Sequence, residues 1–392
     1  MTIIVSPSAH YPSHNWPNSQ ALARALVGKG REVHLVVFST TTDTIPPELL
    51  DHVTAVYSQP PAAWRGTATG QWQNRRWGGL FNVAETVTCL LRALRLSRGR
   101  PDTVVHFIGG SYWVVLVAAI LFRRRFVYSL YSGIMSGPAI GAKALLRWFL
   151  KPLVQRAAAT QRLEFITENE FLRAEVAALV GPHVRIVPYA INDEEEPVSQ
   201  ADARQRLGLP PNEKILLFFG THRLEKDYVT PLKGCLMLPQ TPLALFVGKV
   251  ISENDPARVV ATCQYPNARI VSEFVSEEMA KYYFAAADAL VLPYEAGFSR
   301  GSGVLIECCR HRRPMIASAT PYFSAFLAEY PCGVTYTPLG SESFAAAAQR
   351  LLADTTVFRA ALERARRDHS WSSAAARYLE IYEGKPPLEP RA

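Results

Sequence analysis

Residues 287–318 read ADALVLPYEAGFSRGSGVLIECCRHRRPMIAS and contain signals for a strand, a bend, a helix and a second strand. The apolar segments ADALVLPY and PMIAS have the length and composition of buried strands. Between them, a bend rich in glycine and serine leads into SGVLIECCR, whose apolar spacing is that of a helix. A strand, a helix and a strand in this order predict a parallel sheet with a helix on its face.

The same alternation of strand and helix signals runs through both halves of the 392-residue chain. TIIVS, EVHLVVFS, TVVHFIG and RFVYSLYSG are predicted strands of the first half, and the rhythm restarts with ILLFFG, LALFVGKV and ARIVSEFV. The acidic, proline-bounded segment from Asn192 to Glu213 lacks periodicity and is predicted to be a linker. Because the chain exceeds the length at which one core stops growing, we predict two α/β domains.

The overall composition is that of a globular protein. Hydrophobic residues make up 48% of the chain and charged residues 19%, which is enough to bury two cores. The six cysteines form no Cys-x-x-Cys pair and have no histidine partners at zinc spacing, so neither a disulfide framework nor a structural zinc site is predicted. The first residues lack the basic and apolar regions of a signal peptide. We therefore expect a cytoplasmic protein, with the inner face of the membrane as a second location.

Positive charge is concentrated in the first half of the chain. The net charge is +8, and the stretch from Pro61 to Thr160 has fourteen Lys or Arg against two acids, Glu85 and Asp102. Aromatic residues are not interleaved with these cations as stacking on bases requires, so no nucleic-acid partner is predicted.

Some of these cations have helical spacing. Lys143, Arg147 and Lys151 lie four residues apart and would form one stripe on a helix. Such a stripe can contact anionic lipid or can be a solvated face over a core helix. The longest apolar run, residues 112–122, has eleven residues against the roughly 20 that span a bilayer, so it is predicted to be a buried helix. The membrane prediction is therefore a peripheral contact through residues 143–151.

The bend of residues 295–301 is placed where parallel sheets bind ligands, at the carboxyl end of a strand. Gly301 and Gly303 leave the backbone open to a ligand, and the first N–H groups and the dipole of the following helix favour a phosphate. Glu307, one turn further on, offers a carboxylate to sugar hydroxyls. The alternative is an ordinary strand-to-helix turn capped by serine.

A pair of cations follows another predicted strand. ILLFFGTHRLEKDY places Arg223 and Lys226 three residues apart. Arginine can bind a phosphate through two hydrogen bonds and lysine adds a point charge, so the pair can neutralise a diphosphate leaving group without a metal. The sequence has no Asp-x-Asp pair and no Walker spacing. We predict no metal and no cofactor, with two surface cations as the alternative.

These motifs resemble those of the retaining GT-B glycosyltransferases of glycosyltransferase family 4 (glycosyl transferases group 1). FFGTHRLEKD, FAAADALVLPY, GVLIECCRHRRPMIAS and HSWSSAAARYLEIY are similar to the family's diphosphate loop, strand, donor helix and closing helix, in that order. The resemblance implies two Rossmann-like domains facing a central cleft. The acceptor domain would be residues 1–190 and the nucleotide-sugar domain residues 191–368, with a final helix in 369–392 that crosses back to the first domain.

The resemblance also implies roles for individual residues. Arg223 and Lys226 would bind the donor diphosphate and Glu307 the ribose, while the backbone near Val275 would face the nucleobase. His106, at the end of TVVHFIGG, would lie near the transferred sugar or else be a structural histidine. The predicted donor-binding residues are Glu307, Gly303, Val304, Ser302, Ser299, Glu295, Gly297, Phe298 and Val275.

The chain departs from the family pattern in the bend and at the end of the helix. The family's first Glu lies eight positions before the second, and Ser299 occupies that position. Either Glu295, together with Gly297 and Phe298, binds the sugar from a longer loop, or Ser299 and neighbouring amides do so. Arg312 replaces the glycine that usually ends the helix, which strains the backbone if its φ is positive.

A third departure lies in the first loop, which lacks the family's usual glycine pair. Asn15 and Trp16 are candidates for contact with donor or acceptor, and packing is the alternative for Trp16.

The predicted function is that of a retaining glycosyltransferase. It would move a hexose-type sugar, without metal, from a nucleotide donor such as a UDP or GDP sugar to a glycan, lipid-linked or small-molecule acceptor. Arg223 and Lys226 would stabilise charge that develops on the leaving phosphate. Two alternatives stay open: a GT-B-like nucleotide-binding scaffold without turnover, and a nucleotide-sugar epimerase.

Overall fold

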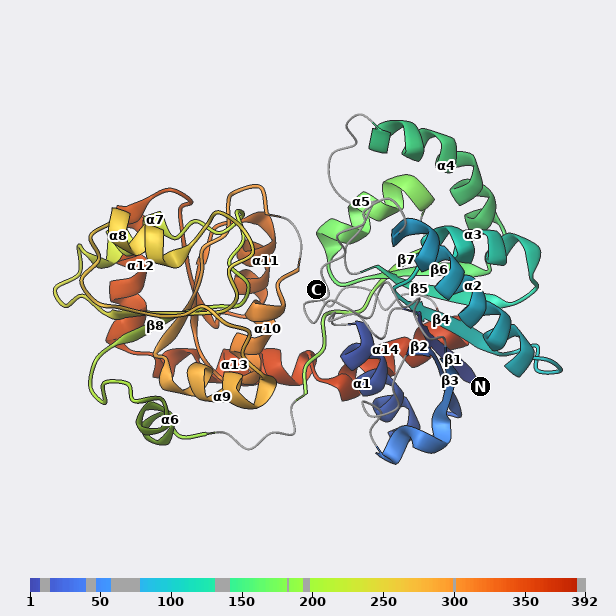
Figure 1. The fold of residues 1–392 in the computed structure, drawn as a ribbon, viewed down its shortest axis with the longest axis horizontal. Helices are drawn as coiled ribbons and strands as arrows, with labels where there is room; N and C mark the ends of the chain where they lie inside the picture. Colours follow the sequence, from blue (N-terminus) through green and yellow to red (C-terminus); the bar gives the residue numbers. More distant parts are fainter. Residues whose placement is uncertain are drawn as a thin grey trace. The chain divides into compact units, whose positions relative to one another are not determined.

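The computed structural model describes residues 1–7, 15–39, 47–57, 78–130, 142–181, 183–192, 198–298 and 301–385. The chain divides into two compact units, which are treated separately below (Figure 1). The first unit comprises Met1–Pro188 with Trp371–Ala392, and the second comprises Tyr189–Ser370.

The first unit is built on a parallel sheet. Its described strands are Thr2–Ser6 (β1), Val33–Ser39 (β2), Val53–Tyr57 (β3), Val104–Ile108 (β4), Arg125–Leu130 (β5), Leu163–Thr167 (β6) and Val184–Ile186 (β7). They pair in the order β3-β2-β1-β4-β5-β6-β7, with parallel neighbours throughout. β1 and β4 are buried along their whole length, as the central strands of a sheet covered on both faces must be.

The helices of the first unit connect these strands. They are Asn15–Gly28 (α1), Gly78–Leu96 (α2), Tyr112–Leu121 (α3), Ala142–Ala159 (α4), Glu170–Val180 (α5) and Trp371–Glu383 (α14), with a 3-10 helix at Pro47–His52 (η1). The last of them, α14, packs against α1. Most of α3 is buried, as predicted for residues 112–122. Within the described ranges, no helix is both long enough and apolar enough to span a membrane.

The second unit is also built on a parallel sheet with connecting helices. Its described strands are Ile215–Phe219 (β8), Leu243–Val247 (β9), Ala268–Val271 (β10), Ala289–Leu292 (β11), Met315–Ser318 (β12) and Gly333–Tyr336 (β13). They form a parallel sheet in the order β10-β9-β8-β11-β12-β13. Its helices are Gln200–Leu207 (α6), Val229–Cys235 (α7), Pro256–Thr262 (α8), Glu277–Ala286 (α9), Gly303–Arg310 (α10), Pro321–Glu329 (α11), Ser341–Ala353 (α12), Thr356–Phe358 (η3, 3-10) and Arg359–Asp368 (α13).

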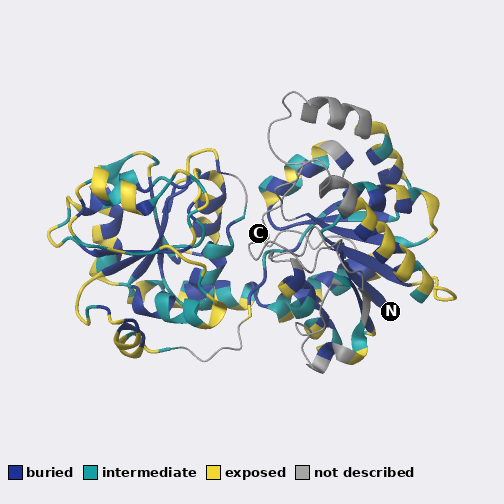
Figure 2. Ribbon diagram, in the orientation of Figure 1, coloured by how far each residue is buried: buried dark blue, intermediate teal, exposed yellow. Residues whose placement is uncertain are grey.

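Each sheet is a doubly wound α/β layer with its own core. In the second unit α7 packs on α12 and α6 packs on α9, and Figure 1 shows these pairs on opposite faces of the sheet. Figure 2 shows the strands buried and the outer helix faces exposed. The predicted α/β class with two Rossmann-like units is confirmed. In each sheet the strand order reverses beside the first strand, which is where such folds bind ligands.

The predicted linker from Asn192 to Glu213 is partly wrong, because it contains α6. Ser199 caps the helix by accepting a hydrogen bond from the amide of Asp202, and Gly208 ends it in the left-handed conformation. Arg204 fixes α6 to the sheet through an ion pair of 2.8 Å with Asp288. The helix was not predicted because it is short and polar and so shows no apolar periodicity. Its capping residues could have been recognised in the sequence.

Candidate functional site

The candidate donor site lies at the carboxyl ends of β8 and β11. The loops that follow these strands are joined by backbone hydrogen bonds. The amide of Asp227 donates to the carbonyl of Pro293 (2.6 Å), and that of Glu295 donates to the carbonyl of Glu225 (3.0 Å). The two loops that carry predicted donor-binding residues are therefore held side by side.

Lys226 is a buried cation at the centre of this arrangement, with 6% of its surface exposed. Its Nζ donates to the carbonyl of Phe219 (2.9 Å) and lies 5.7 Å from the centre of the Tyr294 ring. Gly220, whose φ is +89°, lies beside both this Nζ and α10. A Cβ atom built onto Gly220 would be 3.7 Å from the Nζ and 3.2 Å from Cγ2 of Val304 in the first turn of that helix. The ammonium group is therefore close to the first turn of α10.

The surroundings of Lys226 disfavour the charged form of its side chain. Burial, followed by the charge of Arg223, lowers the pKa of Lys226 to about 7, and Glu225 opposes this only in part. Among the described residues no carboxylate forms an ion pair with Lys226. An anion bound beside Nζ would favour the charged form.

Arg223 lies at the start of the same loop and is more open. Half of its side chain is exposed (51%), and its Nη1 is 3.8 Å from Oε1 of Glu225. Nδ2 of Asn254 donates to the carbonyls of Arg223 (2.8 Å) and Lys226 (2.5 Å). One amide group therefore fixes the backbone at both ends of the Arg–Lys pair, while the guanidinium can reach a ligand.

The N-terminus of α10 faces this loop. Ser302 is its N-cap residue but makes no capping hydrogen bond with its side chain in the described part of the chain; its hydroxyl lies 3.3 Å from that of Tyr294. At Gly303 an added Cβ would only reach ordinary contact distance from Tyr189 (3.8 Å). The side-chain serine cap of the alternative interpretation is therefore not formed, and the Ser302 hydroxyl does not occupy the first amides of this helix.

Glu307 lies in the middle of α10 and is already ion-paired. Its Oε2 lies 3.3 Å from Nη1 of Arg310 and 3.3 Å from Nε2 of His311, and the His311 ring stacks on Phe284 at 4.6 Å. Burial raises the pKa of the Glu307 carboxyl, but the hydrogen bond from His311 and the charge of Arg310 outweigh it and leave the pKa below its usual range. Glu307 is therefore an ionised hydrogen-bond acceptor.

The bend after β11 is anchored by an aromatic side chain. Phe298 is buried, and its ring packs at a tilt against that of Tyr294, with ring centres 4.1 Å apart. The centre of the Phe323 ring lies 5.8 Å from that of Phe298. Glu295 and Gly297 are exposed, and space is open around Gly297. Ser299 lies outside the described residues. Both readings of the sugar-binding bend therefore stay predictions, with Phe298 as an anchor in either case.

The remaining donor candidate and the candidates of the first half lie elsewhere. Val275 is half-buried just before α9. His106 is fully buried in β4, with Nδ1 2.7 Å from Oη of Tyr382 and Nε2 2.8 Å from Oγ of Ser129, and burial lowers its pKa to about 3. In the described arrangement His106 is thus a structural link to α14.

Asn15 and Trp16 begin α1. Trp16 is 7% exposed and belongs to the core of the first unit, which agrees with packing. The side chain of Asn15 lies outside the described residues. Because the two units are described separately, His106, Asn15 and Trp16 stay predictions with respect to the donor site.

Sequence reasoning missed three residues that build the site. Tyr294 contacts both Lys226 and Ser302, and Asn254 braces the cationic loop from a distant segment. His222 is buried beside Oη of Tyr228 (2.6 Å), and burial and Lys226 lower its pKa to about 4. Of the three, His222 and Tyr294 had a sequence signal, since His222 closely follows a predicted strand and Tyr294 ends one.

Comparisons with known proteins bear on the fold and on the class of protein. No family model matches the chain. A D-inositol 3-phosphate glycosyltransferase from Nocardiopsis dassonvillei is 26% identical over 321 residues, covering 73% of this chain and 72% of that protein. A sucrose-phosphate synthase from Thermosynechococcus elongatus has a TM-score of 0.71 and 20% identity, with 98% of each chain covered. Anabaena HepE in complex with UDP and glucose has a TM-score of 0.66 and 14% identity, with 98% of this chain and 100% of that one covered.

The two solved structures share the fold, and the sequence relative is a glycosyltransferase. The fold and the sequence relative together define the class: the chain is a glycosyltransferase of the GT-B type. More closely, it resembles the group 1 glycosyltransferases, as its motifs predicted.

Proposed function

We propose that this protein is a retaining glycosyltransferase that moves a hexose-type sugar from a nucleoside-diphosphate donor without a metal ion. The observation that carries the proposal is the placement of the buried Lys226 ammonium beside the first turn of α10. A diphosphate between them would meet one cation, the amides of the helix N-terminus and, from the open side, Arg223.

In this proposal the chemistry is mainly electrostatic. A nucleoside diphosphate is a good leaving group, and its negative charge grows as the glycosidic bond breaks. Lys226, Arg223 and the amides of Gly303 and Val304 would stabilise that charge more in the transition state than in the bound donor. Retention of the anomeric configuration is the stereochemical part of the proposal.

Glu307 would hold the ribose by accepting hydrogen bonds from its hydroxyls. Its two positive partners, Arg310 and His311, keep the carboxylate ionised and oriented. Its side chain is 29% exposed, so a ligand can approach it. Anabaena HepE is solved with UDP and glucose, which makes UDP sugars the first donors to test.

The acceptor side is proposed to be the first unit, and the basic charge of that unit favours a lipid-linked or anionic glycan acceptor over a neutral one. A cytoplasmic location, at or near the inner face of the membrane, goes with such an acceptor. The proposed acceptor-side candidate in this unit is Asn15, at the start of α1.

Calorimetric titration of UDP, GDP and dTDP and their hexose conjugates tests the donor site. We expect one nucleotide series to bind, and Glu307→Gln to weaken binding about tenfold or more by removing a charged acceptor. Glu342→Gln, which changes an exposed glutamate on α12, is the matched control. NMR of the released or transferred sugar then gives its anomeric configuration.

The outcomes separate the parts of the proposal. Inverted product would overturn retention but not the donor site. Binding that Glu307→Gln weakens, without any sugar release or transfer, would favour the scaffold reading. If no nucleotide binds, the donor assignment itself fails.

A further inference from the structure

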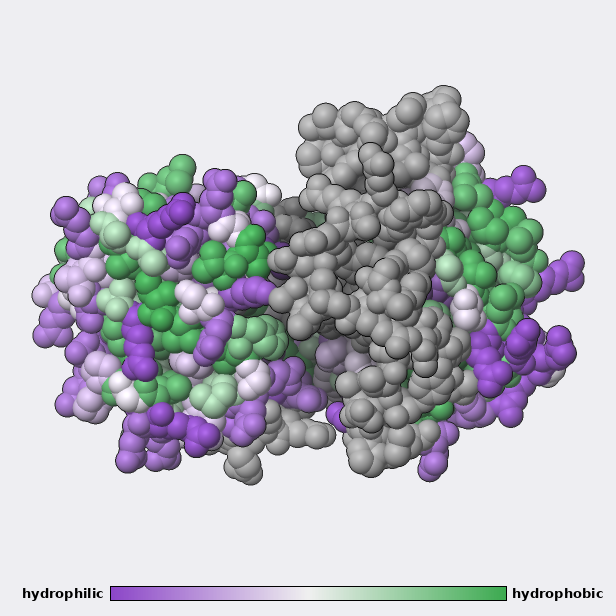
Figure 3. Space-filling view, in the orientation of Figure 1, coloured by the Kyte–Doolittle hydropathy of each residue, from purple (hydrophilic) through white to green (hydrophobic). Residues whose placement is uncertain are grey.

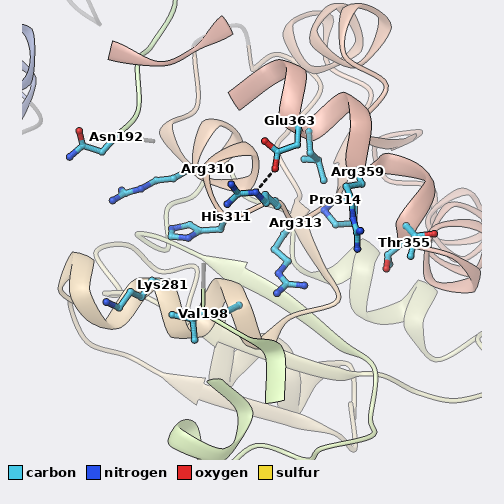
Figure 4. A pocket seen from close by; sticks show the side chains of 14 residues that line it. Asn192, Val198, Lys281, Arg310, His311, Arg313, Pro314, Thr355, Arg359 and Glu363 are labelled. Atoms are coloured by element: carbon cyan, nitrogen blue, oxygen red, sulfur yellow. Dashed lines mark hydrogen bonds and ion pairs between the residues drawn. The ribbon is translucent and has the colours of Figure 1, made fainter. Parts of the chain in front are cut away.

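The second unit contains a pocket of about 420 Å³ whose lining includes none of the predicted donor-binding residues (Figure 4). It does include Arg310 and His311, the ion-pair partners of Glu307. It is bounded by α9, the end of α10, the turn before β12, and η3 with α13. Its lining residues are Asn192, Val198, Lys281, Ala285, Arg310, His311, Arg312, Arg313, Pro314, Thr355, Thr356, Arg359, Leu362 and Glu363.

This pocket lies at the opposite end of α10 from the candidate donor site. The helix has eight residues, so its two ends are separated by about 12 Å at 1.5 Å per residue. Pro314 immediately precedes β12, which puts the pocket at the amino-terminal edge of that strand, whereas donors bind at the carboxyl-terminal edge. A ligand here would not occupy the diphosphate position.

The lining is strongly basic: five lysine and arginine side chains face one carboxylate, Glu363. That carboxylate pairs with Arg312 and also with Arg366 (3.1 Å) outside the lining. Arg310 pairs with Glu307, which is also outside the lining. Ion pairs within the described residues therefore account for two of the five cations, Arg310 and Arg312.

Three of the cations have no carboxylate partner in the described part of the chain: Lys281 on α9, Arg313 before β12 and Arg359 on α13. Figure 4 shows them coming from three separate elements around the pocket. The Nε of Arg313 is buried and has no hydrogen-bond acceptor among the described residues. Burial lowers the pKa of Arg313, which shows the cost of keeping this charge here.

Helix stability explains some of these cations but not Arg359. Arg310 and His311 lie at the C-terminus of α10, where positive charge offsets the helix dipole. Arg359 is the first residue of α13, and no acidic residue lies in that first turn. A cation at a helix N-terminus is unfavourable unless an anion is nearby.

We propose that this pocket binds a small phosphorylated molecule, at a site separate from the donor site. Lys281, Arg313 and Arg359 would bind the phosphate, with the hydroxyls of Thr355 and Thr356 beside them. The apolar lining of Ala285 and Leu362 would contact the rest of the molecule. The volume is within the range of small-molecule pockets, whereas a flat basic surface would suit a membrane better. The proposal does not depend on the donor assignment.

Calorimetry on the full chain tests this site with orthophosphate, pyrophosphate, glucose 6-phosphate and glucose as probes. We expect a phosphorylated probe to bind and glucose not to bind. Arg359→Glu should weaken binding about tenfold or more, because a charge-assisted hydrogen bond is replaced by repulsion. Arg258→Glu is the matched control, since it also changes an exposed arginine in the first turn of a helix of this unit. Equal melting temperatures of the two variants would show that both fold.

Two further variants make each outcome decisive. Phosphate binding that Lys226→Met removes but Arg359→Glu leaves unchanged belongs to the donor site and overturns the proposal. The sequence also has four acids, Asp193 to Glu196, between the pocket residues Asn192 and Val198. If the wild type binds no probe, the variant with these four acids changed to amides is titrated as well. If the amide variant binds a phosphorylated probe and Arg359→Glu removes that binding, the site is supported. If neither the wild type nor the amide variant binds any probe, the proposal is overturned.

Vesicles of phosphatidylcholine with phosphatidylglycerol test the other source of phosphate. Vesicle binding that depends on Arg359, with no binding of any soluble probe, would assign the pocket to a lipid headgroup and would overturn the proposal of a small-molecule ligand.

Discussion

Lys226 is the residue whose charge the fold controls most closely. Within the described ranges its Nζ donates to one carbonyl oxygen, that of Phe219, and the neighbouring Arg223 repels it. A neutral amine is therefore accessible near pH 7, whereas a lysine in water stays charged up to about pH 10. A bound diphosphate would reverse this preference.

Nucleotide binding should therefore be accompanied by proton uptake. With a pKa of about 7, Lys226 is about nine-tenths deprotonated at pH 8, and a bound diphosphate raises the pKa above that pH. We expect close to one proton taken up at pH 8 and much less at pH 6. Calorimetry of nucleotide binding in two buffers with different ionisation enthalpies measures this number.

Lys226→Arg supplies the control for proton uptake, because the guanidinium stays charged at both pH values. Its nucleotide binding should show no proton uptake at pH 8. Uptake of the same size in the variant would show that another group takes up the proton.

Arg312 shows how far a single residue could be read from the sequence. It occupies the position of the usual helix-ending glycine, and the expected strain is present, since its φ is +56°. The side chain then pairs with Glu363 of α13. The sequence indicated the backbone conformation, but a partner 51 residues away could not be identified from it.

Among the elements, α14 depends most on contacts remote in sequence. Arg125 in β5 donates to the carbonyls of Ile381 (2.5 Å) and Tyr382 (3.0 Å) at the end of α14. His106 in β4 is hydrogen-bonded to Oη of Tyr382. The last helix of the chain is therefore fixed to strands of the first unit by buried polar contacts.

Tyr382→Phe should lower the free energy of unfolding of the first unit by about 1–3 kcal/mol, because Nδ1 of the buried His106 loses its partner. Chemical denaturation followed by a probe in this unit measures the change. Tyr282→Phe removes the same hydroxyl where the described structure shows no hydrogen bond for it, and should have little effect. Equal losses in the two variants would contradict the proposed link.

At the scale of the whole molecule, the surface of the first unit combines apolar and basic features. In the first unit, Val83, Val87 and Leu91 form an exposed apolar stripe on α2, and Leu121 is 67% exposed on α3, which contacts α2. Figure 3 shows apolar surface over these helices. Of the predicted basic stripe, Lys151 is exposed, and the side chains of residues 143–150 lie outside those described. The membrane prediction therefore gains a second, apolar feature.

If the first unit contacts lipid, the protein should sediment with vesicles that contain phosphatidylglycerol, and less so at high salt. Leu91→Glu should reduce the bound fraction about tenfold, because an apolar contact becomes a repelled charge. Met237→Glu, at similar exposure in the second unit, is the control. Equal effects of the two substitutions, or no vesicle binding by the wild type, would contradict the membrane prediction.

Most strands could be read from the sequence because central parallel strands are continuous apolar runs. TIIVS, for example, is β1 from end to end. The sequence reasoning left β3, β6, β7 and β13 unidentified. β3, β7 and β13 lie at sheet edges, where one side of the strand is unpaired and the apolar signal is weaker. In the inner strand β6, Glu164 interrupts the apolar run. α6 was not predicted because a helix this short and polar shows no apolar periodicity.

The sequence by itself determined the two α/β units, the Arg223–Lys226 pair and the helix with Glu307, because apolar period and local spacing follow directly from the order of residues. Only the tertiary structure decided that Tyr294 and Asn254 support Lys226, that Phe298 anchors the bend, and that His106 is buried against Tyr382. The basic pocket at the end of α10 also belongs to this second group. These contacts join residues far apart in the chain, and the energy of burying and pairing them has no local signature in the sequence.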